Sequence, residues 1–341
     1  MLRRRKGGVA MLRDRFGRVH DYLRISVTDR CNLRCMYCMP EEGMAFADSA
    51  ELLTYDEIAE VVSVAAELGI RKLRITGGEP LVRPGLDGLI RRLASIPGIR
   101  DIALTTNGLL LGRAAASLKA AGLNRVNISL DTLDPARFRL IARNGELKRV
   151  LESIEAAADA GLTPIKLNCV LLRGINEDEI PAFLRLAYER PLHIRFIEYM
   201  PIGHDDENWK NHYLPLGRVL EVAEAEGYRL FPIRERTASG PSDDYGLEGG
   251  AGSLGLIHPV SDQFCRRCNR LRLTADGHLK PCLYWVDELN VRPAIGDREA
   301  LKAVFGRAVD IKPENHEMAA KLFGGAQSHK PTERRMSQIG G

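Results

Sequence analysis

The segment CNLRCMYCMP, residues 31–40, carries three cysteines spaced C-x3-C-x2-C. Thiolates at Cys31, Cys35 and Cys38 can ligate zinc or an iron–sulfur cluster, and a structural site of either kind usually has four protein ligands. A site with three ligands keeps one position open for a substrate or cofactor. The pattern therefore indicates either structural zinc with a distant fourth ligand or a cluster whose open iron can chelate a small molecule.

A second triplet is spaced C-x2-C-x13-C and consists of Cys265, Cys268 and Cys282. Here a Cys3His zinc site is an open alternative, because His278 lies between the last two cysteines. Arg270 and Arg272 follow Cys268 at alternate positions, and alternate residues of an extended strand share a face. Two arginines beside a cluster suit an anionic ligand such as a phosphate chain better than structural zinc.

The 341 residues include seven cysteines, an odd number placed mostly in tight clusters. This indicates metal ligation in a reducing compartment, so we expect a cytoplasmic protein without a disulfide framework. No apolar run approaches the roughly 18 residues of a membrane span. The non-enzymatic alternative is a zinc-stabilised nucleic-acid-binding protein, which needs a basic stripe with interleaved aromatics. A net charge of +4 and 6% aromatic residues do not favour it.

Residues 22–200 alternate between strand-like and helix-like segments, and so supply a scaffold for the cysteines. Six strand-like runs are separated by five helical segments; the runs are YLRISV, RKLRITG, RDIALTT, RVNISLD, TPIKLNCVLL and HIRFIEYM. Such alternation predicts a parallel sheet with right-handed crossovers. Six units are too few for an eight-stranded barrel, so we expect an α/β fold with a partial (β/α)6 TIM-type barrel. The first triplet follows the first strand, at the edge where such folds place their sites.

The chain divides into three predicted parts: a basic N-terminal arm (1–20), the partial barrel (21–235) and a C-terminal region (236–341) that covers the open side of the barrel. Seven Lys and Arg residues against one Asp in the arm predict a solvated, partly disordered segment. The glycine-rich stretch 246–255 predicts a loop or linker, and TADG predicts a hairpin turn. On composition alone, SQIGG at the end is a mobile tail.

The C-x3-C-x2-C motif, with Tyr37 before its third cysteine, resembles the radical S-adenosylmethionine superfamily. GGEP, residues 77–80, strengthens the match, because this segment holds the amino group of S-adenosylmethionine in that superfamily. The second triplet, the NRLRLT segment and the pair Gly340–Gly341 narrow the resemblance to the GTP 3′,8-cyclase (MoaA-type) family of molybdenum cofactor biosynthesis. The resemblance runs from about Tyr22 to Gly341.

The resemblance implies two 4Fe-4S clusters, one on each cysteine triplet, with S-adenosyl-L-methionine at the open iron of the first and guanine at that of the second. It implies reductive cleavage of S-adenosylmethionine to methionine and a 5′-deoxyadenosyl radical, which takes hydrogen from C3′ of GTP. Bonding of C3′ to C8 then gives (8S)-3′,8-cyclo-7,8-dihydroguanosine 5′-triphosphate. Implied partners are a flavodoxin- or ferredoxin-type electron donor and a downstream cyclic pyranopterin monophosphate synthase (MoaC-type). No DNA, RNA or membrane partner is implied, and a homodimer is left open.

Carried over position by position, the resemblance implies that the six cysteines hold the clusters, with Cys31, Cys35 and Cys38 at the centre of catalysis. It implies S-adenosylmethionine contacts at Tyr37, Gly78, Ser129 and Met200. It implies GTP contacts at Arg24, Arg74, Thr105, Lys166, Arg270 and Arg272. The residues agree in part, because three of these cations lie in or near strand ends and a cationic ring there suits a triphosphate. Arg195 is a further candidate of the same kind, and Gly340–Gly341 is expected to enter the pocket where side chains would not fit.

The enzymatic alternative is a two-cluster radical S-adenosylmethionine enzyme that modifies a peptide. Such enzymes tend to carry extra cysteines in the C-terminal region, which complete the ligation of their auxiliary clusters. This chain has only Cys265, Cys268 and Cys282 in that region. The cysteine count therefore favours the nucleotide cyclase.

Overall fold

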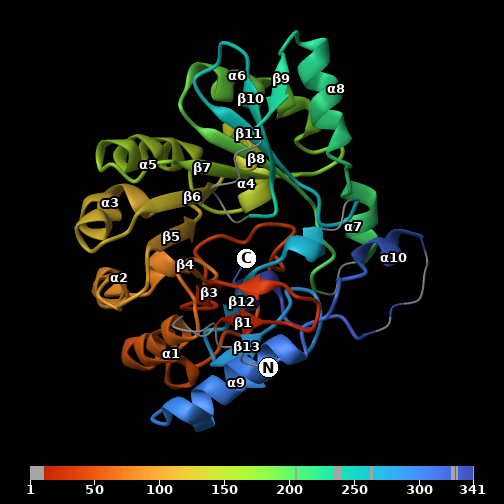
Figure 1. Ribbon diagram of the computed structural model, residues 1–341. Helices are drawn as coiled ribbons and strands as arrows, with labels where there is room; N and C mark the ends of the chain where they lie inside the picture. Colours follow the sequence, from red (N-terminus) through yellow and green to blue (C-terminus); the bar gives the residue numbers. More distant parts are fainter. Residues whose placement is uncertain are drawn as a thin grey trace.

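The computed structural model describes residues 11–203, 206–233, 240–261, 264–323, 327 and 329–340. A sheet of twelve strands runs through these residues in the order β14-β13-β12-β3-β4-β5-β6-β7-β8-β11-β10-β9 (Figure 1). Its centre consists of six parallel strands, β3 (Tyr22–Ser26), β4 (Lys72–Thr76), β5 (Asp101–Thr106), β6 (Arg125–Ser129), β7 (Lys166–Leu171) and β8 (His193–Glu198). These are the six strands that the sequence alternation predicts.

Helices connect these strands and lie outside the curve of the sheet in Figure 1. The five predicted helices are α1 (Tyr55–Glu67), α2 (Leu86–Ala94), α3 (Leu111–Ala120), α5 (Leu147–Asp159) and α6 (Ile180–Glu189). The sequence interpretation missed a further helix, α4 (Pro135–Ala142). Its start is marked by Asp134, whose side chain accepts a hydrogen bond from the Arg137 amide, and by proline at the first helical position.

The C-terminal region extends the barrel sheet at both edges. Strand β11 (Ser253–Ile257) pairs in parallel with β8, and β12 (Arg270–Leu273) pairs in parallel with β3. On their other edges, β11 and β12 each pair with an antiparallel strand. The parallel part of the sheet therefore ends there, and the barrel is open. These neighbours are β10 (Asp243–Leu247), followed by β9 (Leu230–Pro232), and β13 (His278–Lys280), followed by β14 (Leu289–Asn290). Because strands from both sides of residue 235 share one sheet, our boundary at that residue stays a prediction.

The glycine-rich stretch 246–255 is not a linker, because it forms the end of β10, a turn and the first half of β11. Gly255 shows why glycine is required in a strand here: a Cβ atom at this position would lie 2.3 Å from Ser242 Oγ. The TADG turn is confirmed, since it joins the antiparallel strands β12 and β13.

Residues 11–20, where we expected a solvated arm, form a hairpin of β1 (Leu12–Arg13) and β2 (Val19–His20). The buried Arg18 side chain pairs with Asp14 at 2.6 Å and donates to the carbonyl oxygens of Cys265 and Pro313 at 2.8 and 2.6 Å. The expectation is wrong for this part, because Arg18 ties it to the second cysteine triplet. Residues 1–10, which hold the other part of the basic excess, lie outside the described residues.

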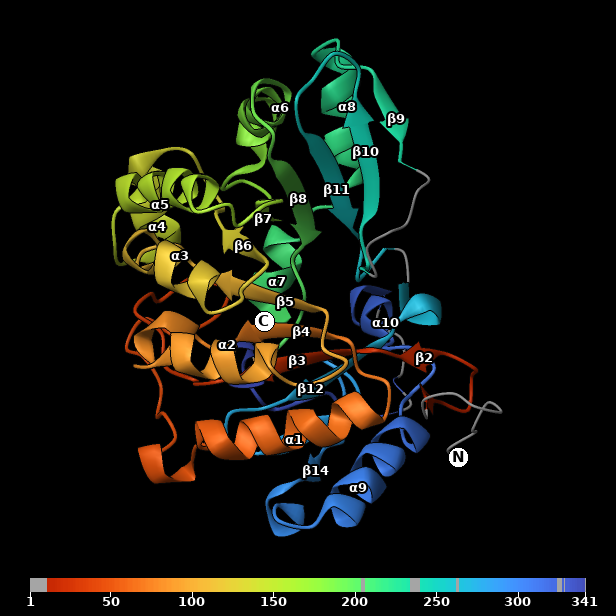
Figure 2. The same ribbon diagram turned by 60° about the vertical axis from the view of Figure 1, so that its left-hand side comes forward.

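The remaining helices belong mainly to the second half of the chain and are α7 (Asp206–His212), α8 (Gly217–Ala225), α9 (Arg298–Asp310), α10 (Met318–Phe323) and α11 (Met336–Ile339). Helix α9 packs beside α1 in both views (Figures 1 and 2). A small second core, which includes Tyr199, Trp209 and Trp285, joins the barrel loops to the C-terminal region. No helix in the described part of the chain has the length and apolarity to cross a membrane.

Candidate active site

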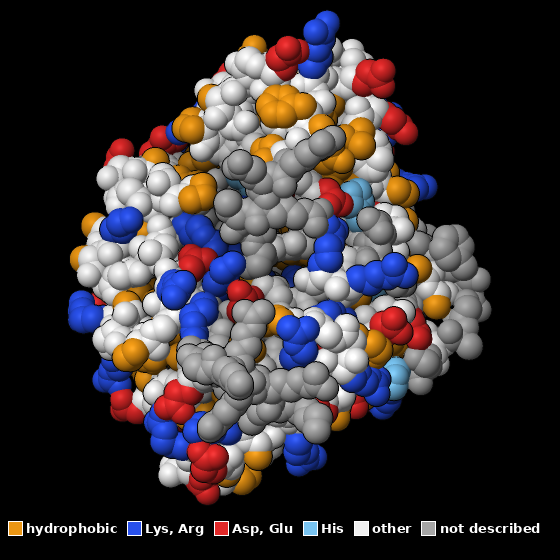
Figure 3. All heavy atoms as spheres, viewed as in Figure 1, with side chains coloured by type: hydrophobic (Ala, Val, Ile, Leu, Met, Phe, Trp, Pro, Cys, Tyr) orange, Lys and Arg blue, Asp and Glu red, His pale blue; other side chains and the backbone are white. Residues whose placement is uncertain are grey.

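A cavity of about 410 Å³ lies between the barrel strands and the C-terminal region, and all six clustered cysteines line it as free thiols. The ten other contact residues implied by the resemblance line it too, namely Tyr37, Gly78, Ser129, Met200, Arg24, Arg74, Thr105, Lys166, Arg270 and Arg272. Lys and Arg side chains gather around the middle of this face in Figure 3. The structure therefore brings every candidate residue to one site, whereas the sequence spreads them over 259 positions, from Arg24 to Cys282.

The first triplet lies in the loop after β3, and GGEP holds that loop in place. The Gly78 amide donates to the Thr28 carbonyl at 2.7 Å, and the Glu79 amide donates to the Arg30 carbonyl at 2.8 Å. A Cβ atom on Gly78 would lie 2.4 Å from the Arg30 carbonyl oxygen. Glycine is thus required for the close approach of two backbones that sets the cysteine loop against the end of β4.

The thiols of the first triplet are buried in surroundings that disfavour negative charge. Burial raises the pKa of Cys38 to about 12, and it also raises the pKa values of Cys31 and Cys35. The carboxyl groups of Asp131 and Glu79 add to this effect, and burial raises their own pKa values to about 6 and about 7. Such a site stabilises a bound cation, because positive charge offsets both the thiolates and the carboxylates.

Asp131 is a site residue that the sequence interpretation did not single out. Its Oδ2 accepts a hydrogen bond from the Tyr37 hydroxyl at 2.6 Å, and its Oδ1 accepts one from the Val170 amide at 2.9 Å. The Tyr37 ring also contacts Tyr199 edge-on, with 6.1 Å between ring centroids. Tyr37 is therefore fixed from two sides. The available signal was the position of Asp131 in the SLDTLD segment, as the last residue of the predicted strand RVNISLD.

The second triplet is assembled from a 3₁₀ turn at Phe264–Arg267, the residue Cys268 before β12, and Cys282 after β13. Lys312, which is buried, donates from Nζ to the Arg270 carbonyl at 3.0 Å and to the Pro281 carbonyl. It thus joins the two segments that carry the triplet. Burial raises the pKa of Cys268, but the positive charges of Lys312 and Arg270 outweigh burial and hold it at about 5.

The strand that follows Cys268 begins at Arg270, so Cys268 itself lies just outside it. Arg270 and Arg272 nevertheless both line the cavity, whereas Leu271 and Leu273 are fully buried in the core. The alternation inferred from the sequence is therefore confirmed for the arginines.

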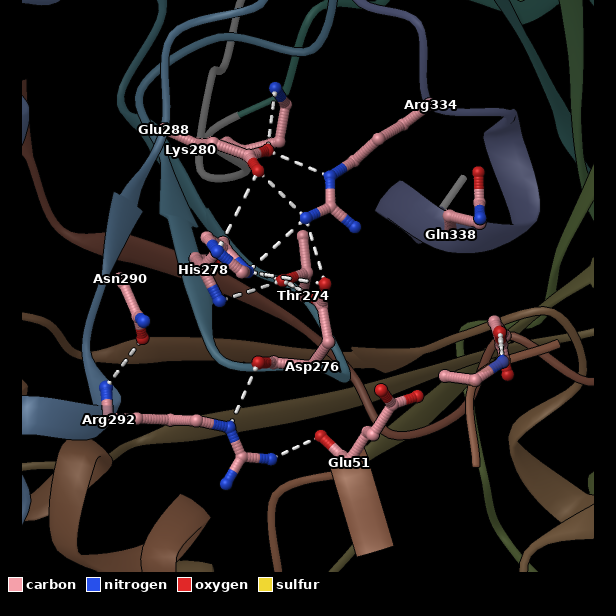
Figure 4. Close-up of polar contacts among 12 residues, drawn as sticks. Glu51, Thr274, Asp276, His278, Lys280, Glu288, Asn290, Arg292, Arg334 and Gln338 are labelled. Atoms are coloured by element: carbon pink, nitrogen blue, oxygen red, sulfur yellow. Dashed lines mark hydrogen bonds and ion pairs between the residues drawn. The ribbon is translucent and has the colours of Figure 1, made fainter. Parts of the chain in front are cut away.

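The Cys3His alternative at the second triplet is wrong, because His278 faces a different set of groups (Figure 4). Its Nδ1 atom lies 3.2 Å from both Asp276 Oδ2 and Arg334 Nη2, and its Nε2 atom lies 3.9 Å from Glu288 Oε1. Within the described ranges, no three His, Cys, Asp or Glu side chains are grouped closely enough for a single metal ion.

A group of buried cations covers the barrel side of the cavity. Burial lowers the pKa of Lys166 to about 7, that of Arg195 to about 9 and that of Arg272 to about 10, and neighbouring cations add to the effect. Arg24 is shifted in the same direction for the same reasons. Arg74 donates to the hydroxyls of Tyr22 and Thr105. An excess of buried positive charge is what a polyphosphate would offset.

Gly340 occupies a position that requires glycine, but it is not among the residues that line the cavity, so the predicted entry into the pocket stays a prediction. Its φ is +80°, and a Cβ atom there would lie 2.6 Å from Thr76 Cγ2. Its carbonyl oxygen accepts a hydrogen bond from Arg272 Nη1 at 2.6 Å. The composition-based expectation of a mobile tail is therefore wrong for residues 337–340, where Ser337 and Ile339 are buried, while Gly341 lies outside the described residues.

Two family models match the chain. The radical SAM superfamily matches residues 25–187, and the family described as Molybdenum Cofactor Synthesis C matches residues 192–318. The GTP 3′,8-cyclase of Listeria monocytogenes serovar 1/2a is 54% identical over 331 residues, which cover 97% of this chain and 99% of that protein. The chain belongs to the GTP 3′,8-cyclase family. A further member, from Pelotomaculum thermopropionicum, is 49% identical over 97% of this chain and all of its own length.

Solved structures agree with the fold of this GTP 3′,8-cyclase family member. Streptococcus suis SuiB bound to S-adenosylmethionine has a TM-score of 0.61 at 15% identity, over 91% of this chain and 74% of SuiB. The structure described as native anSMEcpe with bound AdoMet has a TM-score of 0.55 at 14% identity, over 87% and 82% of the two chains. Both share the fold. The cofactors of the family, S-adenosylmethionine and 4Fe-4S clusters, fit the donor set here, which is two groups of three free cysteines at one cavity.

Proposed function

We propose that this protein converts GTP to (8S)-3′,8-cyclo-7,8-dihydroguanosine 5′-triphosphate, the first stage of molybdenum cofactor biosynthesis. The observation that carries the proposal is the meeting of two three-cysteine sets and a group of buried cations at one cavity. When bound, S-adenosylmethionine and the cluster on the first triplet supply an electron and a 5′-deoxyadenosyl radical that can take hydrogen from a sugar carbon.

The protein side of the reaction is to hold and orient the two reactants. Cys31, Cys35 and Cys38 hold one cluster, and the Gly78 backbone, Ser129 and Met200 bind S-adenosylmethionine beside it. Tyr37 keeps one face of this half rigid, because Asp131 and Tyr199 fix its ring. Enclosure between the barrel and the C-terminal region excludes water, which protects a reactive radical.

The other half of the cavity binds GTP. Cys265, Cys268 and Cys282 would hold the second cluster, which would supply an open coordination position for the guanine. The triphosphate is bound by the cations and the hydroxyl group that share the cavity, which are Arg24, Arg74, Thr105, Lys166, Arg270 and Arg272. Holding C3′ and C8 of one nucleotide close together makes ring closure an intramolecular step.

The test is anaerobic turnover of the reconstituted protein with GTP, S-adenosylmethionine and dithionite, with the products identified by mass spectrometry and NMR. We expect 5′-deoxyadenosine and the cyclised nucleotide in equal amounts, and no cyclised product when GTP is left out. Formation of 5′-deoxyadenosine while GTP stays unchanged would contradict the proposal and favour the peptide-modifying alternative.

The partners follow from the same chemistry. We propose a low-potential electron donor of the flavodoxin or ferredoxin type and a MoaC-type synthase that consumes the product. Thiolate-bound clusters require a reducing compartment, so we place the reaction in the cytoplasm. Reduction of the reconstituted protein by purified flavodoxin, followed by visible absorbance, tests the first of these. Failure with both flavodoxin and ferredoxin, where dithionite succeeds, would exclude it.

A further inference from the structure

Arg334 lies just before the last helix and forms a fork of charged hydrogen bonds with the β12–β13–β14 region (Figure 4). Its Nε donates to Glu288 Oε2 at 2.8 Å, and its Nη2 donates to Glu288 Oε1 at 2.7 Å and to Asp276 Oδ2 at 2.8 Å. The Arg334 side chain is 21% exposed. Two-point contact with a half-buried carboxylate sets the direction of the guanidinium as well as its position.

The two carboxylates that hold Arg334 are themselves fixed. Glu288 Oε2 also accepts from Lys280 Nζ at 3.4 Å, and the fully buried Lys280 donates to the Trp285 carbonyl at 3.0 Å. Asp276 accepts from the Thr274 hydroxyl. Burial opposes their ionisation, but hydrogen bonds and nearby cations keep the pKa values of Asp276 and Glu288 below their usual range. Both are therefore charged at neutral pH.

The segment that follows Arg334 touches both halves of the active site. Met336 and Ser337 line the same cavity as the cysteines of the first triplet. The Ser337 hydroxyl donates to Met44 Sδ at 3.6 Å, and Ile339 is fully buried. Three residues after Ser337, the Gly340 carbonyl accepts from Arg272. One stretch of chain thus joins the loop that follows the first triplet to an arginine beside the second.

This stretch cannot hold its shape alone, because α11 is a single helical turn of four residues. Its conformation depends on what holds its two ends. The distal end is held by Arg272. The proximal end is held by Arg334, which lies outside the cavity lining. Its partner Asp276 lies in the turn between β12 and β13, before Cys282, and its partner Glu288 lies after Cys282, directly before β14.

We propose that Arg334, held by Asp276 and Glu288, is a positioning residue that seats residues 335–340 against Met44 and Arg272 and so keeps the two halves of the active site aligned. The inference rests on the proposed function for its catalytic consequence, but the seating itself is a structural claim. Without the anchor, the Ser337 hydroxyl leaves Met44 and the Gly340 carbonyl leaves Arg272. S-adenosylmethionine is then cleaved without a matching amount of GTP being cyclised.

The test compares Arg334→Ala and Arg334→Lys with the control Arg190→Ala, which removes a two-point pair with the exposed Glu155. Amide hydrogen exchange is measured on the reconstituted, anaerobic protein. In Arg334→Ala we expect exchange at residues 335–340 to accelerate roughly tenfold or more, the change that follows from losing hydrogen bonds to charged groups. Exchange in the barrel strands stays unchanged, Arg334→Lys is intermediate, and Arg190→Ala resembles the wild type. Wild-type exchange at 335–340 in Arg334→Ala would overturn the proposal.

The second readout is the ratio of 5′-deoxyadenosine to cyclised nucleotide, which should rise at least severalfold in Arg334→Ala and stay near one in Arg190→Ala. A loosened segment with an unchanged ratio would also overturn the positioning role. If Arg334→Ala does not fold, Glu288→Gln keeps the shape and weakens the same fork. Because hydrogen exchange needs no turnover, a seated segment in a protein that never cyclises GTP would refute the proposed function and not the seating.

Discussion

The two cysteine triplets have the same number of ligands but different charged neighbours. Around the first, burial and the carboxyl groups of Asp131 and Glu79 raise the thiol pKa values. Around the second, burial raises the pKa of Cys265 to about 12, but Lys312 and Arg270 overcome burial at Cys268 and lower its pKa to about 5. S-adenosylmethionine carries a sulfonium and GTP carries a triphosphate. The carboxyl groups beside the first triplet suit a cationic reactant, and the cations beside the second triplet, together with the buried cations of the same cavity, suit an anionic one.

This difference shows that ligand count does not assign a reactant to a site. Three cysteine ligands indicate only that one coordination position is open. The charged groups packed around them decide which reactant is stabilised there. In this protein those groups come from distant parts of the chain, such as Lys312 for the second triplet. The difference between the two triplets can be tested by removing cysteine ligands, by removing charged side chains, or by changing the pH.

The largest effect is expected from the first triplet. Replacing Cys31, Cys35 or Cys38 by Ala removes a ligand of the cluster that meets S-adenosylmethionine, so 5′-deoxyadenosine formation should be abolished. The measurement is chromatographic quantitation of 5′-deoxyadenosine after anaerobic incubation with dithionite. Cys169→Ala, which changes a cysteine of the core, is the matched control and should keep cleavage. Cleavage that survives in the triplet variants would refute the assignment.

Replacing Cys282 by Ala should separate the two activities. This cysteine belongs to the substrate half, so GTP conversion should fall far more than cleavage of S-adenosylmethionine. Both products are measured in the same reaction. Equal loss of both would show that the triplets do not have separate roles.

A smaller effect is expected from the arginines of β12. Arg270→Ala and Arg272→Ala should each weaken GTP binding by about 1–3 kcal/mol, the range for hydrogen bonds to charged groups. Binding of S-adenosylmethionine, measured in parallel by isothermal titration calorimetry, should change little. Unchanged GTP affinity would show that these arginines do not bind the anionic reactant.

The smallest effect concerns pH and Lys166. Burial lowers the pKa of its ammonium group to about 7, so much of it is neutral just above that pH. A bound triphosphate raises this pKa, so binding takes up a proton, and affinity should fall as pH rises from 7.5 to 9 by at most about tenfold per unit. Calorimetry in buffers of different ionisation enthalpy measures the proton uptake. Lys166→Met should abolish it, and proton uptake that persists in the variant would exclude Lys166 as its source.

The sequence predicted the parts of the site that depend on local pattern. The six strands follow from alternation, and the cysteine spacing, GGEP and the glycine at 340 follow from short motifs. It could not predict contacts made across the fold. Lys312 lies 30 residues after Cys282 in a segment without a motif, and its role exists only because it reaches two carbonyls beside the second triplet. His278 was ambiguous because spacing alone does not show which way a ring faces.

The sequence interpretation misjudged other segments for the same reason: their conformations depend on contacts made across the fold. Arg18 reads as one more charge in a basic arm until the Cys265 and Pro313 carbonyls are placed around it. The glycines at 246–255 resemble a linker because a close approach between strands and a flexible loop both select glycine. Pairing of β11 with β8 and of β12 with β3 is non-local and leaves no signal in either segment alone.

The most direct test of the central claim is equilibrium binding of each reactant to reconstituted Cys38→Ala and Cys282→Ala proteins. The account predicts a double separation: Cys38→Ala loses S-adenosylmethionine binding and keeps GTP binding, while Cys282→Ala keeps S-adenosylmethionine binding and binds GTP more weakly. Parallel loss of both reactants in either variant would contradict the division of the cavity into a cationic-reactant half and an anionic-reactant half.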